Sequence, residues 1–252
     1  MKNLLLPLVL FACASAAHSQ ELTVAAAADL RPALDAITPV FQAESGIKLR
    51  VSYGSSGNFF QQLQNGAPFD IFLSANVDYP KKLADAGLTV PNSYYEFARG
   101  SIVLIVPYDS KLDLSEGLHI LLTPTVKKIA IANPSHAPYG QAAVAAIKSA
   151  GIYDWAAPHL VNGENVSQAA SFVLSGAAEV GIVAKSLALA PAAAKQVKFV
   201  DVSANLYQPL LQAMVVMKSS KQQASAMKFE SFMRGDGAKQ ILNRYGFEIP
   251  LR

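Results

Sequence analysis

The sequence predicts an α/β protein with two lobes, each a mostly parallel sheet flanked by helices, and a ligand cleft between them. Three strand-to-helix units follow one another in residues 22–87, and a second such series begins at residue 129. Strands that alternate with helices favour parallel sheets. A long apolar strand, 210–217, has no helix directly before it, which indicates that the chain returns there from the second lobe to the first.

The beginning of the chain has the pattern of a secretory signal peptide. A basic start precedes an apolar run, 4–12, and small residues continue to Ser19. The apolar run is shorter than the roughly 20 residues that span a membrane. We therefore expect export to the periplasm with no membrane-embedded part. A lipid anchor at Cys13, the only cysteine, is disfavoured because Phe11 is bulky where acylation boxes have small residues.

Length and charge restrict the remaining function classes. The net charge is +3 and the sequence has no dense Lys/Arg run, which argues against nucleic acid as a partner. Removing residues 1–19 as a signal peptide leaves a chain long enough for two lobes of about 110 residues. We place the first lobe at 20–102 and 208–252, and the second at 103–207. The double crossing makes a hinge, and ligands bind in clefts between lobes.

The first lobe begins with a strand, 22–28, that turns directly into a helix. Asp29 stands where a helix N-cap would stand. The following apolar residues have the spacing of one helix face: Leu30, Leu34, Ile37 and Phe41. Strand 47–53 precedes a helix that ends at Asn65-Gly66, and strand 70–74 precedes a helix from Asn76 to Ala86.

The remaining elements repeat this scheme. Residues 100–107 are predicted as one strong strand that crosses into the second lobe. The further strands are expected at 129–132, 160–161, 180–183, 197–202 and 210–217, and the further helices at 141–150, from Val166 onward, 221–234 and 238–245.

Four of the predicted turns carry small or hydrogen-bond-donating residues at the start of a helix. They are Ala28-Asp29, Ser55-Ser56-Gly57, Pro138-Tyr139-Gly140 and Asn165-Val166, two in each lobe. A helix N-terminus has unpaired backbone N–H groups and a partial positive charge, so it can bind anions. Four such termini in one cleft would suit a small oxyanion held by hydrogen bonds, without Lys or Arg.

Five sequence blocks resemble the periplasmic molybdate-binding proteins of ABC importers. The blocks are Thr23-Val-Ala-Ala-Ala-Ala-Asp-Leu30, Ser55-Ser56, Gly66-Ala-Pro-Phe-Asp-Ile-Phe-Leu-Ser-Ala75, Gly181-Ile-Val-Ala184 and Arg244-Tyr-Gly-Phe247. They cover nearly all of the mature chain in the family's order. The resemblance implies a type II periplasmic-binding fold that captures molybdate or tungstate and delivers it to a membrane permease. It further implies a monomer, neither an enzyme nor a cofactor protein.

The resemblance also implies a set of ligand contacts. Molybdate would be bound by Ala28, Asp29, Ser56, Tyr139 and Val166, the last through its backbone N–H. A serine is common in the family where this chain has Asp29. Some members have a tyrosine where this chain has Ala184, and the phenol of Tyr139 is expected to replace it from the opposite side of the cleft.

Asp29 is the departure from the family that matters chemically. Molybdate is a dianion without a proton, and a carboxylate pointing at it in a dry cleft would repel it. Three explanations stay open. Asp29 caps its own helix and offers the ligand only its backbone N–H, which is the favoured one; or the ligand carries a proton, as hydrogen phosphate does, and Asp29 accepts it; or the carboxylate coordinates the metal centre.

Two other functions remain as alternatives. The first is a receptor for another oxyanion such as phosphate. The second is an exported serine hydrolase that uses Ser56, for which the sequence shows no Gly-x-Ser-x-Gly elbow and no evident base.

Overall fold

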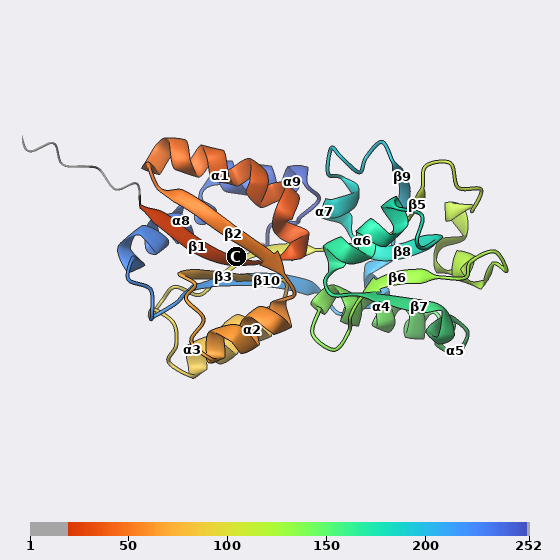
Figure 1. Cartoon of the computed structure of the whole chain (residues 1–252), viewed down its shortest axis with the longest axis horizontal. Coiled ribbons are helices and arrows are strands. Elements are labelled where there is room, and N and C mark those ends of the chain that lie inside the picture. Colours follow the sequence, from red (N-terminus) through yellow and green to blue (C-terminus); the bar gives the residue numbers. More distant parts are fainter. Residues whose placement is uncertain (1–19, 251–252) are drawn as a thin grey trace, which may run out of the picture.

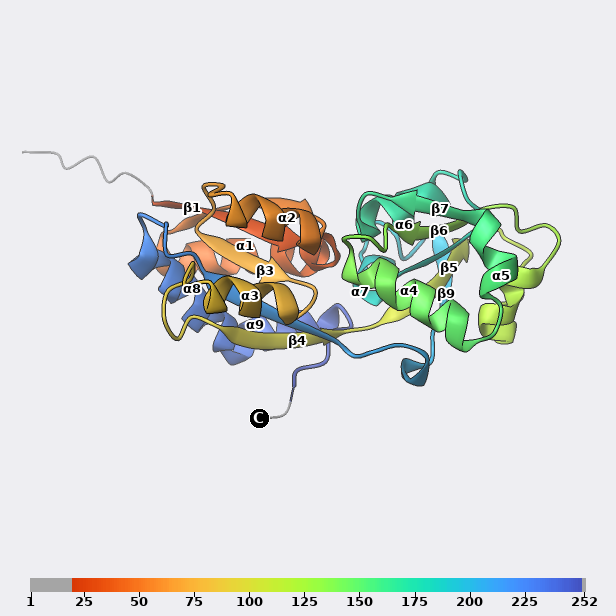
Figure 2. The ribbon, with the colours of Figure 1, turned by 90° about the horizontal axis from the view of Figure 1, so that it is seen from below.

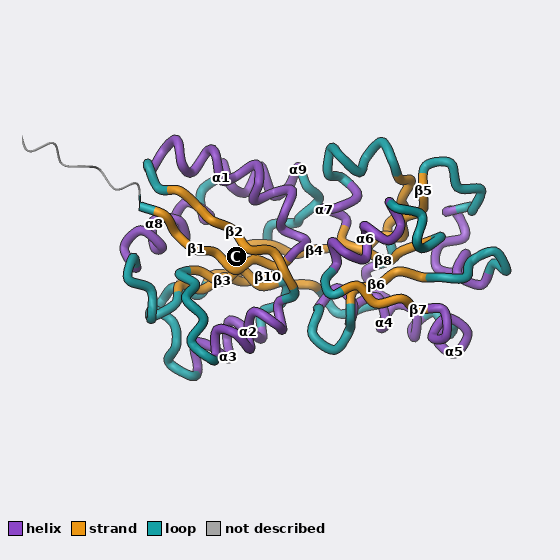
Figure 3. The backbone as a smooth tube through the Cα atoms, viewed as in Figure 1, coloured by secondary structure: helices purple, strands orange, loops and turns teal. Residues whose placement is uncertain are grey.

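The computed structural model describes residues 20–250. The predicted signal peptide, 1–19, and with it Cys13, lie outside the described residues. Two five-stranded sheets lie side by side along the long axis of the molecule, each with helices on both faces (Figures 1 and 3). The predicted two-lobed α/β fold class is confirmed.

The first sheet has the strand order β2-β1-β3-β10-β4. Its strands are β1 (Glu21–Ala27), β2 (Lys48–Gly54), β3 (Ile71–Ser74), β4 (Tyr95–Gly100) and β10 (Leu210–Val216). The helices of this lobe are η1 (Ala28–Leu30), α1 (Arg31–Ser45), α2 (Ser56–Gln64), α3 (Asp78–Asp85), α8 (Gln223–Arg234) and α9 (Asp236–Arg244). Strand β1 pairs in parallel with β2 and β3, and β10 is antiparallel to β3 and β4.

The second sheet repeats this arrangement in the order β7-β6-β8-β5-β9. Its strands are β5 (Ile102–Pro107), β6 (Ile129–Ala132), β7 (Leu160–Gly163), β8 (Val180–Ala184) and β9 (Val197–Asp201). Its helices are η2 (Leu114–Leu122), α4 (Pro138–Ser149), α5 (Tyr153–Ala156), η3 (Ala157–His159), α6 (Val166–Leu174), α7 (Lys185–Ala188) and η4 (Ala204–Leu206). In each sheet, therefore, one antiparallel strand, β10 or β5, lies beside a parallel group of three.

The chain passes between the sheets twice, from β4 to β5 and from η4 to β10 (Figure 2). The prediction of one strand over 100–107 was wrong in part, because sheet membership changes at Ser101 and β5 begins at Ile102. Strand β4 was missed because Glu96 and Arg99 interrupt its apolar pattern. Within residues 20–250, no helix is long and apolar enough to cross a membrane.

Helix α1 shows how the apolar pattern positions the site. Its predicted face is buried, since Leu34 and Ile37 are inaccessible and Phe41 is 2% exposed. Burying each such side chain contributes about 1.5–3 kcal/mol. Gly46 ends the helix in the left-handed conformation, with φ 72°, which glycine adopts without steric cost. The packed helix thereby fixes the turn that precedes it.

Candidate functional site

The four turns predicted to bind an anion meet at one cavity between the lobes. Two come from the first lobe, after β1 and β2, and two from the second, after β6 and β7. The lining residues are Ala27, Ala28, Asp29, Gly54, Ser55, Ser56, Ala75, Ala137, Pro138, Tyr139, Asn165 and Val166. All five residues singled out from the sequence are among them.

The cavity is small. It leaves about 10 Å³ for the centre of a water molecule, and by this measure a single water needs roughly 10–15 Å³. The closed cavity thus has room for about one water-sized group, which favours a small ligand over an amino acid, a sugar or a peptide. Among the described lining residues, Asp29 is the one with an ionisable group that carries charge at neutral pH.

Three helix starts line this cavity. Ser56 and Val166 are the first residues of α2 and α6, and Tyr139 is the second residue of α4. The first N–H groups of a helix have no acceptor within it. In α6, the Asn165 side chain caps the N–H groups of Ser167 and Gln168, so the N–H of Val166 remains for a ligand.

The hydroxyl of Ser56 is positioned by the backbone of Ala75, the residue that follows β3 in the same lobe. Its Oγ accepts a hydrogen bond from the backbone N–H of Ala75 at 2.9 Å, and the residue is 1% exposed. Because this bond uses Oγ as an acceptor, the hydroxyl proton is left to donate. The helix termini and this hydroxyl together place several hydrogen-bond donors around the cavity, and such donors are suited to an oxyanion.

The carboxyl group of Asp29 is fully buried. Its Oδ2 accepts a hydrogen bond from Gln212 Nε2 at 2.6 Å, whereas Oδ1 has no donor among the described residues. The favoured prediction that Asp29 caps its helix was wrong. Ala27 is the N-cap of η1, and no side chain caps either η1 or α1. The intervening 3₁₀ turn places Asp29 inside the turn and brings its side chain to β10.

Burial raises the pKa of Asp29 from 3.8 to about 6, and the interactions with Gln212 and with the Tyr139 hydroxyl offset only part of that rise. Desolvation disfavours the charged form of an acid. The same burial, together with the nearby Asp29, raises the pKa of Tyr139 well above its usual value. The phenol therefore stays protonated, and its oxygen also accepts from Gln212 Nε2, at 3.2 Å.

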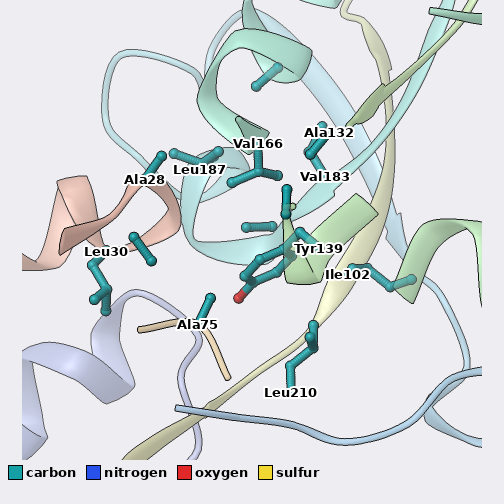
Figure 4. Packing of buried hydrophobic residues seen from close by; sticks show 14 of the residues in the cluster. Ala28, Leu30, Ala75, Ile102, Ala132, Tyr139, Val166, Val183, Leu187 and Leu210 are labelled. Carbon is teal, nitrogen blue, oxygen red and sulfur yellow. The ribbon is translucent and has the colours of Figure 1, made fainter. Parts of the chain in front are cut away.

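Tyr139 lies among residues of both lobes. It belongs to the apolar cluster that residues of both lobes form, and in Figure 4 its hydroxyl points away from Val166. The ring is 2% exposed. The phenol is thus directed toward Gln212, and the backbone of Tyr139 is the part of this residue at the start of α4.

The two lobes are joined around the cavity by hydrogen bonds. The carbonyl oxygen of His136 in the second lobe accepts from the N–H of Gly57 at 2.9 Å and from Ser55 Oγ at 2.7 Å. On the other rim, Ser167 Oγ donates to the carbonyl of Ala28 at 3.0 Å and Ser186 Oγ donates to that of Asp29 at 2.7 Å. The structure therefore represents a closed form.

The serine pair does not have the geometry of a hydrolase. Nδ1 of His136 lies 2.7 Å from Ser55 Oγ, but Ser55 already donates its proton to the His136 carbonyl. Nδ1 must then donate to Ser55 and cannot act as its base. The candidate nucleophile Ser56 instead accepts from the backbone N–H of Ala75.

Comparison with known proteins defines the family. Residues 22–248 match the family model of bacterial extracellular solute-binding proteins. The chain belongs to this family. Two proteins named molybdate-binding protein ModA are similar to it. That of Azotobacter vinelandii is 34% identical over 95% of this chain and 94% of the relative. That of Rhodobacter capsulatus is 33% identical over 92% and 89%.

The fold of this solute-binding protein has a close counterpart among solved structures. The Azotobacter vinelandii periplasmic molybdate-binding protein superposes with a TM-score of 0.86 at 33% sequence identity, covering 91% of this chain and all of that chain.

Gln212 is the residue of the solute-binding protein that sequence reasoning missed. It is fully buried, yet it is the one polar side chain within the apolar strand β10. That isolated polar residue was the available signal. Ser167 and Ser186, which donate across the lobes, offered no comparable signal, because serines are common on helices and only the packing of the lobes selects these two.

Replacing Asp29 by Asn is expected to change how the stability of the solute-binding protein depends on pH. The folded-state pKa of about 6 exceeds the unfolded value of 3.8, so between pH 4 and 6 the folded chain retains a proton that the unfolded chain has released. The free energy of unfolding should therefore fall as pH rises through this window. The amide of the variant cannot titrate. From pH 4 to pH 6, the free energy of unfolding of the variant minus that of the wild type should therefore increase by up to about 3 kcal/mol.

Urea unfolding of both proteins at pH 4, 5, 6 and 7 measures this difference. The matched control is Asp236→Asn, which removes a carboxylate whose side chain is 91% exposed. Parallel pH profiles for the wild type and Asp29→Asn would show that the Asp29 carboxyl titrates as it does in the unfolded chain.

Proposed function

We propose that this solute-binding protein captures molybdate, or the similarly sized tungstate, in the interlobe cavity and delivers it to the permease of an ABC importer in the periplasm, without catalysing a reaction. The observation that carries the proposal is the convergence of four helix starts, two from each lobe, on one small cavity. No Lys or Arg is among its described lining residues. Donors from both lobes favour the closed form once the anion is bound.

Each predicted residue takes a defined part in the proposed complex. Ala28 and Asp29 offer backbone N–H groups, Ser56 offers its N–H and hydroxyl, and Tyr139 and Val166 offer N–H groups at the starts of α4 and α6. A tetrahedral oxyanion without protons only accepts hydrogen bonds, which matches the N–H and O–H donors that these residues supply. A hydrogen bond to a charged group contributes about 1.5–3 kcal/mol.

The similarity to proteins named for molybdate supports the same ligand. Delivery to a permease is the role expected of a protein in this family whose two lobes close on their ligand. The described chain also holds no cluster of three or more His, Cys, Asp or Glu residues that could bind a metal ion directly.

A second candidate ligand is hydrogen phosphate, and one observation favours it. Oδ1 of Asp29 lies buried without a donor in the described structure, and hydrogen phosphate carries an O–H group that could donate to it. Molybdate has no such proton. Replacing Asp29 by Asn should weaken binding of a protonated ligand and should maintain or tighten binding of molybdate.

Thermal unfolding of the mature protein with molybdate, tungstate, sulfate and phosphate tests the proposal. A ligand at 100 times its dissociation constant stabilises the folded state by about 2.7 kcal/mol. This corresponds to a rise in melting temperature of about 5–10 °C for a protein of this size. We expect this rise with molybdate and tungstate. A rise with phosphate alone would establish the second candidate, and a rise with none of the four would reject both.

A further inference from the structure

Gln212 occupies an irregular position at the junction of the lobes. It lies in β10, the strand on which the chain re-enters the first lobe, and it is fully buried. Ala98 of β4 pairs with Gln212, whereas Glu96 pairs with Ala213. Phe97 between them has no partner residue on β10 and forms a β-bulge. Bulges redirect the side chains beside them and are common near functional sites. A buried amide there requires hydrogen-bond partners.

The partners of Gln212 belong to different lobes. Its Nε2 donates to Asp29 Oδ2 at 2.6 Å and to the Tyr139 hydroxyl oxygen at 3.2 Å. Asp29 is in η1 of the first lobe and Tyr139 is in α4 of the second. Both line the ligand cavity, and Gln212 does not. One amide group thus uses its two hydrogens to join the two walls of the cavity.

Gln212, Asp29 and Tyr139 form a hydrogen-bonded junction, and this junction has room because Gly100 has no side chain. A Cβ atom on Gly100, the last residue of β4, would lie 2.0 Å from the Tyr139 hydroxyl and 2.9 Å from Gln212 Nε2. Tyr139 therefore packs directly against the backbone of the first crossing strand. This contact and the bond to Gln212 place the start of α4 relative to the first lobe.

We propose that Gln212 is a positioning residue for ligand capture, which holds Asp29 and Tyr139 together in the closed form and raises ligand affinity without touching the ligand. This inference rests on the proposed function of oxyanion capture. The junction lies between the lobes, so it stabilises the closed form relative to an open one. A ligand that first meets the open cleft should bind at an unchanged rate, and loss of the junction should increase its rate of dissociation.

Stopped-flow and calorimetric titration of Gln212→Leu with molybdate test this role. We expect the dissociation constant to rise roughly 10- to 100-fold, as for other buried groups left unpaired. The rise should come from a faster dissociation rate, with the association rate unchanged. The matched control is Gln223→Leu, since Gln223 is exposed and donates to the Lys218 carbonyl far along the same lobe. Its affinity should stay within about twofold of wild type, because an exposed group away from the site has little effect.

Tyr139→Phe removes the member of the junction that belongs to the second lobe, and it deletes only a hydroxyl group. It should also accelerate dissociation. The double variant with Gln212→Leu should lose less affinity than the sum of the two single losses, because both substitutions remove the hydrogen bond between Gln212 and Tyr139. The exchanged pair Asp29→Asn with Gln212→Glu restores an amide opposite a carboxyl. Its affinity should recover to within about fivefold of wild type, since the hydrogen bond across the junction is kept.

A purely structural role would lower the melting temperature of the ligand-free variants and would give additive losses of affinity. Either additivity or wild-type affinity in Gln212→Leu overturns the inference. If Gln212→Leu fails to fold, Tyr139→Phe and the exchanged pair decide by the same criteria. If wild type binds phosphate or sulfate rather than molybdate, the proposed ligand is wrong, and the same variants test the junction with the anion that binds. If none of the four anions binds, both proposals are rejected.

Discussion

Substituting Gly57 by Ala should abolish tight oxyanion binding while leaving the fold of the first lobe intact. A Cβ atom at Gly57 would lie 2.6 Å from the carbonyl oxygen of His136 and 2.9 Å from its Cβ, across the interface between the lobes. The hydrogen bond from the Gly57 N–H to that carbonyl, 2.9 Å in the closed form, would also be displaced. Crowding of this kind typically costs about 1–3 kcal/mol, and the lost bond adds to it.

We therefore expect the dissociation constant for molybdate to rise by roughly 100-fold or more. Gly57 is the second residue of α2, and alanine is a better helix former than glycine, so the melting temperature of the ligand-free protein should not fall. Small-angle scattering should show that the wild type contracts on adding molybdate and that the variant does not.

The matched control for Gly57→Ala is Gly237→Ala. Gly237 lies in α9 of the same lobe, and a Cβ atom there would have no neighbour within 4 Å. This variant should bind like the wild type. Wild-type affinity in Gly57→Ala as well would mean that ligand binding does not require the close approach of His136 to α2.

Replacing Val166 by Pro should remove one ligand contact without disturbing the helix that bears it. Val166 is the first residue of α6, a position where proline is well tolerated because its N–H has no acceptor within the helix. Asn165 before it already has extended backbone angles, φ −149° and ψ 176°, as the residue before a proline prefers. Loss of a hydrogen bond to a charged ligand costs about 1.5–3 kcal/mol.

The dissociation constant for molybdate should accordingly rise by roughly 10- to 150-fold in isothermal titration. Val166→Ala is the control, because it keeps the N–H group while it also loses the valine side chain, which is 3% exposed. It should bind within a few-fold of wild type. Equal losses in the two variants would assign the effect to side-chain packing and would remove the Val166 N–H from the proposed contacts.

Several elements could be predicted because their pattern is local. The face of α1, with Ile37 and Phe41, follows from apolar spacing, and the end of the helix follows from Gly46. The alternation of strands and helices indicated the fold class for the same reason. Strand β4 was not found, since its charged residues Glu96 and Arg99 obscure the alternation, and only pairing with β10 holds it in the sheet.

The candidate site divides in the same way between local and long-range information. The positions of Ser56, Tyr139 and Val166 at helix starts are local properties, and the sequence predicted them as donors before any arrangement in space was known. Their meeting in one cavity depends on closure of the lobes, which brings turns from distant parts of the chain together. No local sequence pattern predicts how close these turns lie in space.

The contact between Asp29 and Gln212 could not be predicted from the sequence. The sequence determined a two-lobed α/β chain, four donor-rich helix starts and a carboxyl group that a dianion should not face. The fold places that carboxyl group against an amide 183 positions later in the chain, at a strand bulge beside the second lobe. A buried polar group takes its partner from the residues that the fold brings near it, and packing of the whole chain selects those residues.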